Sequence, residues 1–232
     1  MIASLSLNPV CATREAYAGI FLSKITRRND KRIAASNAGV QLPALDIAPV
    51  IKSDSSGTTF AFTNHLNAIS PEWHSTHRVT KLLTSPENAM RAPGNDGVAS
   101  RIEQTIGSIG YIEYQFSRQL DLKIATLENK EGDYVHPSEE AFVKGLSSAV
   151  FPENLRVFVP DPSGARSYPI VTYSWALVRR RKPDLTRAKA LQDLFTWCLT
   201  DRQKMSSQSG YVPLPSAVSD KSLAALRTIN VQ

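Results

Sequence analysis

The chain has 232 residues, of which 42% are hydrophobic and 21% charged, an ordinary globular composition that excludes whole-chain disorder. No stretch approaches the roughly 18 to 20 consecutive apolar residues of a membrane-spanning helix. The 27 basic and 21 acidic residues give a formal net charge of +6. This charge favours anionic partners without choosing between nucleic acid, a membrane surface and a small oxyanion.

The segment before residue 12 lacks the positively charged start of a secretory signal, so no signal peptide is expected. The helices that capping residues and apolar spacing predict cover 13–22, 30–36, 58–69, 94–104, a short stretch after 113, 137–146, a stretch after 184 and 219–229. The predicted strands cover 45–52, 108–113, 123–127 and 168–178. Strands that alternate with helices predict an α/β fold.

Neither the cysteines nor the histidines predict a metal site. Cys11 and Cys198 are far apart and lack metal-ligand spacing, and Cys198 lies on an apolar helical stripe that predicts burial. His74 and His77 could share a helical face, but Pro71 favours a loop there and no third ligand is evident. We therefore expect no disulfide, no bound metal and no cofactor.

The loop at residues 52–59 is the most informative stretch for function. It joins the end of a predicted strand to the start of a predicted helix, where backbone N–H groups lack helical acceptors and the helix dipole favours negative charge. Lys52 adds a full positive charge, and Ser56 and Thr58 add hydroxyl groups. The loop therefore predicts an oxyanion site, and the alternative is a serine-rich capping loop.

Two other residues complete this hypothesis. Gly57 has no side chain and so lets an anion approach the backbone amides. Asp54 can only accept hydrogen bonds when it is ionised, so it would repel an anion unless it faces Lys52 and orients it.

An enzyme is the first rival hypothesis, and the sequence does not favour it. Ser56 precedes Gly57, but the Gly-x-Ser-x-Gly pattern of a nucleophilic serine is absent. His65 lies on the following helix, where a partly exposed structural residue is the expected role. The glycine patterns of nucleotide-binding loops are also absent, so we expect a protein that is not an enzyme.

Nucleic-acid binding is the second rival hypothesis and rests on charge alone. The basic clusters at 27–28, 31–32 and 179–182 lack the interleaved aromatic residues of RNA-binding motifs. We interpret them as solvated surface and expect no nucleic-acid partner.

Five segments of the chain resemble the periplasmic phosphate-binding proteins of phosphate ABC transporters. Residues 52–59 are similar to the Arg-Ser-Asp-Gly/Ser-Ser-Gly-Thr anion loop of that family. Four other segments agree with the family in order and spacing, at 19–30, 94–97 with 107–114, 168–173 and 210–215. Together they cover nearly the whole chain.

This resemblance implies a type II periplasmic-binding-protein-like fold, with two α/β lobes, a hinge and an incomplete first lobe. Residues 12–170 would form the second lobe, and residues 1–11 and 171–232 the remnant of the first. The resemblance also implies that Lys52, Ser56, Gly57 and Thr58 bind phosphate and that Asp54 orients Lys52.

The implied function is that of the substrate-binding component of a phosphate ABC transporter. Such a protein would be a periplasmic monomer that delivers inorganic phosphate to membrane permease subunits. Lys52 stands where the family usually has arginine, and the family usually begins with a further stretch of about one-third of its chain. The sequence therefore leaves open an alternative, a truncated or diverged relative with weak or no phosphate binding.

Overall fold

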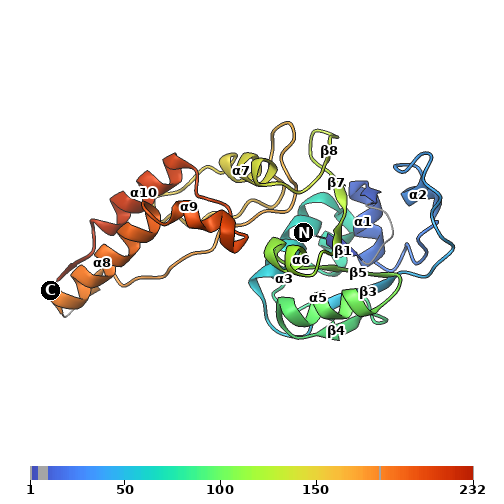
Figure 1. The fold of residues 1–232 in the computed structure, drawn as a ribbon, viewed down its shortest axis with the longest axis horizontal. Helices are drawn as coiled ribbons and strands as arrows, with labels where there is room; N and C mark the ends of the chain where they lie inside the picture. Colours follow the sequence, from blue (N-terminus) through green and yellow to red (C-terminus); the bar gives the residue numbers. More distant parts are fainter. Residues whose placement is uncertain (1, 5–9, 183, 232) are drawn as a thin grey trace. The chain divides into compact units, whose positions relative to one another are not determined.

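The structure, a computed structural model, describes residues 2–4, 10–182 and 184–231 (Figure 1). The chain divides into two compact units. Unit 1 comprises Met1–Ser148 and Val159–Thr172, and unit 2 comprises Ala149–Phe158 and Tyr173–Gln232.

Unit 1 contains a five-stranded mixed sheet in the order β4-β3-β5-β1-β6. The strands are β1 (Ile2–Ser4), β3 (Ala48–Lys52), β4 (Met90–Ala92), β5 (Ser108–Tyr111) and β6 (Lys123–Ile124). The central strand β3 is parallel to β4 and β5, with Val50 opposite Met90 on one side and Gly110 on the other. Val50 and Ile51 are fully buried, as expected for a parallel strand covered on both faces.

Seven helices of unit 1 are described, and several pack directly on this sheet. They are α1 (Arg14–Phe21), α2 (Lys31–Ala34), α3 (Gly57–Ile69), α4 (Pro71–Thr76), α5 (Gly94–Gln104), α6 (Tyr114–Gln119) and α7 (Glu139–Ser147). Helix α5 contacts β3, β4 and β5, and α3 contacts β5. A second sheet in the order β2-β7-β8 is formed by Cys11–Ala12, Thr126–Glu128 and Tyr134–Val135.

Unit 2 is built mainly from α8 (Leu185–Leu199) and α10 (Ser216–Leu226), which contact each other. Two short turns, α9 (Gln203–Ser206) and a 3₁₀ helix (Ser207–Ser209), connect them, and β9 (Arg181–Lys182) pairs in parallel with β10 (Asn230–Val231). Ala188 is the one buried residue of α8. The expectation that Cys198 is buried is therefore wrong, because it is half-buried on a helix with little cover.

Two helix starts predicted from capping residues are confirmed. The side chains of Thr13 and Asp30 each accept a hydrogen bond from a backbone N–H in the first turn of the helix that follows, and Asp184 caps α8 in the same way. These predictions succeed because a cap is a contact between residues two or three positions apart.

Two predicted strands differ from the structure. Residues 171–179 form no strand, although 168–178 are rich in β-branched and aromatic residues, because a strand needs a paired neighbour and none of the described strands pairs with them. The predicted strand at 123–127 is interrupted at Ala125, so its two halves belong to different sheets, β6 to the five-stranded one and β7 to the smaller one.

Two helices also differ from expectation. Residues 71–76 form α4 rather than a loop, because proline is well tolerated in the first turn of a helix and Pro71 occupies that position. Helix α10 begins at Ser216, directly after Pro215, and not at Ser219 or Asp220.

The grouping of the described residues differs from the predicted lobes at the N-terminus. Strand β1 pairs with β5 and β6 inside unit 1, whereas the sequence assigned residues 1–11 to the other lobe. Residues 1 and 5–9 of that segment lie outside the described residues. The lobe boundary at residues 170 and 171 stays a prediction.

Hydrogen exchange is expected to be slower in α3 than in α8. The two helices have 13 and 15 residues and both start at a side-chain cap, but α3 buries five residues, including Phe62 and Leu66, and α8 buries only Ala188. Local opening of α8 therefore exposes less apolar surface and costs less free energy. Amide exchange followed by mass spectrometry tests this expectation, and equal protection of the two helices would contradict it.

Candidate functional site

The predicted anion loop lies where the central strand of unit 1 leads into a long helix. Strand β3 ends at Lys52 and α3 begins at Gly57, with β4 and β5 on either side of β3. Ligands of open α/β sheets bind outside the carboxyl ends of the strands, and this loop occupies that position.

Ser56 is the N-cap of α3. Its Oγ accepts hydrogen bonds from the N–H groups of Thr58 at 3.1 Å and Thr59 at 3.5 Å, and its own N–H donates to the carbonyl of Lys81 at 2.8 Å. Only 7% of the residue is exposed. The capping interpretation of this serine is thus correct, and its geometry also places the hydroxyl at the start of the helix.

Lys52 carries a buried positive charge at the end of β3. The residue is only 4% exposed, and its Nζ donates to Oδ1 of Asn95 at 3.4 Å. No ion pair of Lys52 occurs within the described part of the chain. A neutral amide offsets the desolvation of a buried ammonium group only in part, so this charge favours a nearby anion.

Asp54 contacts the start of α5. Its carboxylate accepts a hydrogen bond from the N–H of Gly94 at 2.7 Å, at the first residue of α5. The ion pairs of the described residues do not include one between Asp54 and Lys52. The prediction that Asp54 orients Lys52 directly is therefore not supported by an ion pair. The carboxylate instead holds the turn that carries Asn95, the acceptor for Lys52.

Gly57 and Thr58 form the first turn of α3. Gly57 is exposed, and no atom lies within 4 Å of the position that a Cβ would take. As the first helical residue it has no helical acceptor for its N–H. Thr58 Oγ1 donates to Oε1 of Glu113 at 3.0 Å. Glu113 was not among the predicted site residues, and its only signal in the sequence was its position just after β5, within the 107–114 segment.

The end of β5 is tied to the same turn of α3. The hydroxyls of Tyr111 and Thr59 lie 3.0 Å apart, and burial raises the pKa of Tyr111. Tyr111 also stacks on Phe62, with ring centroids 4.3 Å apart. These contacts hold the start of α3 beside the residues that follow β5.

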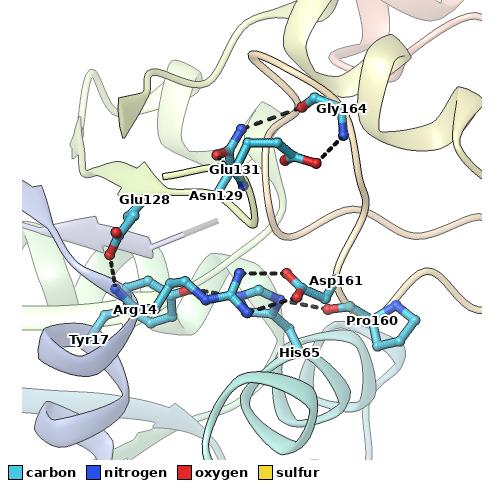
Figure 2. A network of polar contacts seen from close by, with 9 residues as sticks. All are labelled: Arg14, Tyr17, His65, Glu128, Asn129, Glu131, Pro160, Asp161 and Gly164. Carbon is cyan, nitrogen blue, oxygen red and sulfur yellow. Dashed lines mark hydrogen bonds and ion pairs between the residues drawn. The ribbon is translucent and has the colours of Figure 1, made fainter. Parts of the chain in front are cut away.

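His65, further along α3, is buried and not partly exposed as predicted. Figure 2 shows it between the hydroxyl of Tyr17 and the carbonyl of Pro160, each 2.6 Å from one ring nitrogen. Beside it, Arg14 donates two hydrogen bonds to Asp161 at 2.9 and 2.7 Å. Helix α1 and the segment around residue 160 cover this face of α3, which its own sequence cannot reveal.

The environment of His65 determines its charge. Burial lowers the pKa of His65 to about 4, against the opposing effect of its bond to the Pro160 carbonyl. A carbonyl only accepts, so Nδ1 carries the proton and Nε2 accepts from Tyr17. The imidazole is thus neutral at pH 7 and structural in its contacts.

The described residues provide no metal centre. No group of three or more His, Cys, Asp or Glu side chains is placed to hold an ion in this part of the chain. His77 instead stacks on Trp73 at 4.5 Å and bonds to Thr76. Among the described helices, none has the length and apolar character that crossing a bilayer requires.

Comparison with known proteins assigns the chain to a family. Residues 1–202 match the family model described as the PBP superfamily domain. The chain belongs to this family. The match includes all of unit 1 and therefore the whole loop at the start of α3.

Curated relatives share more than a third of their aligned residues with this member of the family. The phosphate-binding protein PstS of Pasteurella multocida is 37% identical over 218 residues, which is 92% of this chain and 62% of that protein. PstS of Xylella fastidiosa (strain Temecula1) is 36% identical over 205 residues, 88% of this chain and 56% of that protein. The chain thus spans about 60% of the length of these relatives.

Solved structures of phosphate-binding proteins share the fold. A high-affinity periplasmic phosphate-binding protein (PfluDING) bound with phosphate matches 96% of this chain and 68% of its own, with a TM-score of 0.72 and 22% identity. A phosphate-binding protein from Stenotrophomonas maltophilia matches 96% and 67%, with a TM-score of 0.71 and 17% identity. At these identities the likeness concerns the fold, and the predicted type II periplasmic-binding-protein class is confirmed.

Proposed function

We propose that this chain binds inorganic phosphate at the start of α3, as the substrate-binding component of a phosphate ABC transporter. The main support for this proposal is Lys52, a buried ammonium group whose described polar contact is a neutral amide. The relatives are named for binding phosphate and not for catalysis, which supports binding without chemical change and does not favour weak or absent binding. In this proposal the chain is a monomer that acts in the periplasm. Its partners are the membrane permease subunits of the transporter.

The proposed ligands are Lys52, Ser56, Gly57 and Thr58. Gly57 is the first residue of α3, so its N–H has no helical acceptor and can donate to an oxyanion at the positive end of the helix dipole. Lys52 supplies a full charge, and Asp54 fixes the turn against which its ammonium group rests. An oxyanion that loses its water would gain charge-assisted hydrogen bonds in exchange.

Replacing Lys52 with methionine is expected to raise the Kd for phosphate about tenfold to a hundredfold. A hydrogen bond to a charged group contributes about 1.5 to 3 kcal/mol, and methionine keeps much of the side-chain volume. Isothermal titration calorimetry of the full chain with inorganic phosphate measures this change. Lys130→Met is the matched control, because Lys130 is exposed and its loss removes the same charge from the surface.

A Gly57→Ala variant tests the backbone part of the site without damage to the fold. The added Cβ meets no protein atom within 4 Å, so the free energy of unfolding should stay unchanged or rise by a few tenths of a kcal/mol. The methyl group would stand beside the amide and raise the Kd for phosphate. Saturable binding that neither substitution alters would place the site elsewhere, and no saturable binding by the unmodified chain would overturn the proposed function.

A further inference from the structure

Lys52 and Asn95 meet because two parallel strands end side by side. Lys52 is the last residue of β3 and pairs in register with Ala92, the last residue of β4. The N–H of Ser53 donates to the carbonyl of Ala92 at 2.9 Å, which continues the pairing past the end of β3. Helix α5 begins shortly after β4, so its first turn lies beside the end of β3 and brings Asn95 to the ammonium group of Lys52.

Asp54 holds this turn in place from the loop that follows β3. The N-cap of α5 is Pro93, whose side chain makes no capping hydrogen bond. The Asp54 carboxylate supplies the missing acceptor, because it accepts from the N–H of Gly94 at 2.7 Å. Gly94 has a φ of +63°, which favours glycine, and Asn95 follows it directly. The backbone that carries Asn95 is therefore fixed by a contact from the anion loop itself.

The acceptor that meets Lys52 carries no charge. An ammonium group only donates, so Oδ1 of Asn95 faces Nζ of Lys52, at 3.4 Å. This is the hydrogen bond that Nζ makes within the described residues, so two of its three protons remain to donate to a ligand. The ion pairs of the described residues do not include Lys52. Asn95 thus orients the positive charge without neutralising it.

Asparagine is not the most stabilising residue for position 95. The first turn of a helix favours negative charge, and Asp96, in the same turn, provides it. An Asn95→Asp substitution would add to this favourable interaction and would also give the buried ammonium group of Lys52 a charged partner. Departures from the locally favourable residue are expected at functional positions.

We propose that Asn95 is a positioning residue, which holds the ammonium group of Lys52 at the anion loop and leaves its charge available because the amide is neutral. This rests on the proposed function. A bound anion then provides the negative charge that Lys52 lacks among the described residues of the unliganded chain. In Asn95→Asp the new carboxylate would take that place before the anion arrives and would repel it.

Replacing Asn95 with aspartate is expected to move affinity and stability in opposite directions. The Kd for inorganic phosphate should rise about tenfold or more, because the ammonium group is neutralised and the anion meets a second negative charge. The urea midpoint of the unliganded chain should stay the same or rise, since a buried charge gains a partner. Calorimetric titration and urea denaturation of the full chain measure the two effects. Asn88→Asp adds the same charge at an exposed position and should leave both unchanged.

Removing the acceptor tests whether Asn95 acts through Lys52. Asn95→Ala should raise the phosphate Kd about threefold to tenfold, because the ammonium group loses its orientation. It should also lower the urea midpoint, in contrast to Asn95→Asp, because the buried ammonium group loses its acceptor. In a Lys52→Met background Asn95→Ala should leave the Kd unchanged, since no ammonium group remains to be positioned.

The outcomes separate this proposal from the proposed function. An unchanged phosphate Kd in Asn95→Asp, or a fall of both affinity and urea midpoint, would overturn the role of Asn95 and leave phosphate binding intact. An equal rise of the Kd in Asn95→Ala with and without Lys52 would also overturn it, because Asn95 would then act independently of the ammonium group. Failure of the unmodified chain to bind phosphate would overturn both proposals.

Discussion

Replacing Phe62 with alanine is expected to lower the free energy of unfolding by about 3 to 5 kcal/mol. The side chain is 1% exposed and stacks on Tyr111 at 4.3 Å, and Phe21 meets it edge to face at 4.7 Å. Alanine would leave a cavity between α1, α3 and β5, because the surrounding rings belong to separate elements and cannot close the gap fully. The loss is a large part of the roughly 5 to 15 kcal/mol by which a domain is stable.

Phe60 provides the matched control for this substitution. It lies on the same helix two residues earlier and is half-buried. Phe60→Ala removes the same atoms from a position nearer the surface and is expected to cost clearly less. Urea denaturation of the two variants compares the losses directly, and equal losses would show that the aromatic cluster around Phe62 does not dominate the stability of unit 1.

Acid is expected to destabilise the chain through His65 by up to about 3 kcal/mol. The pKa of His65 is about 4 in the folded chain, because burial disfavours the imidazolium, and its ordinary value is 6.5. Between these values the unfolded chain binds the proton and the folded chain does not, so stability falls as the pH falls from about 6.5 to about 4. Above pH 6.5 His65 is neutral in both the folded and the unfolded chain, so the free energy of unfolding no longer changes with pH through this residue.

The structure explains what the added proton disrupts. Neutral His65 accepts from Tyr17 through Nε2 and donates to Pro160 through Nδ1, and the imidazolium can only donate. The hydroxyl of Tyr17 would have to turn, and burial raises its pKa well above the ordinary 10.0, so it keeps its proton. The hydrogen bond between α1 and α3 would therefore reverse its direction, and the buried hydroxyl proton of Tyr17 would lose its acceptor.

His65→Gln isolates this effect from the acid response of the carboxylates. Glutamine has a donor and an acceptor but no titration in this range, so the variant should lose less stability than the unmodified chain between pH 6.5 and 4. Thermal unfolding measured in steps across this interval gives the two slopes. Parallel curves would show that His65 does not titrate differently in the folded and unfolded chains.

Contacts between near neighbours were predictable from the sequence. Thr13, Asp30 and Asp184 cap helices through bonds to residues two or three positions away, and the loop at 52–59 joins a strand to a helix as expected. The α/β fold class was also predictable from the sequence. Helices and strands that alternate along the chain can bury their apolar faces in only a few arrangements. The residue types of the loop, together with its position between a strand and a helix, were enough to select it as the candidate site.

Contacts between distant segments were decided by the tertiary structure alone. Glu113 meets Thr58 across 55 residues, and His65 meets Pro160 across 95, and no local pattern encodes either pair. The residues at 171–179 have the composition of a strand, yet no described strand pairs with them. Propensity acts within a few residues, whereas burial, pairing and the direction of a hydroxyl proton depend on which segments meet, and this is why the sequence located the loop and only the folded chain determined the contacts of its hydroxyls.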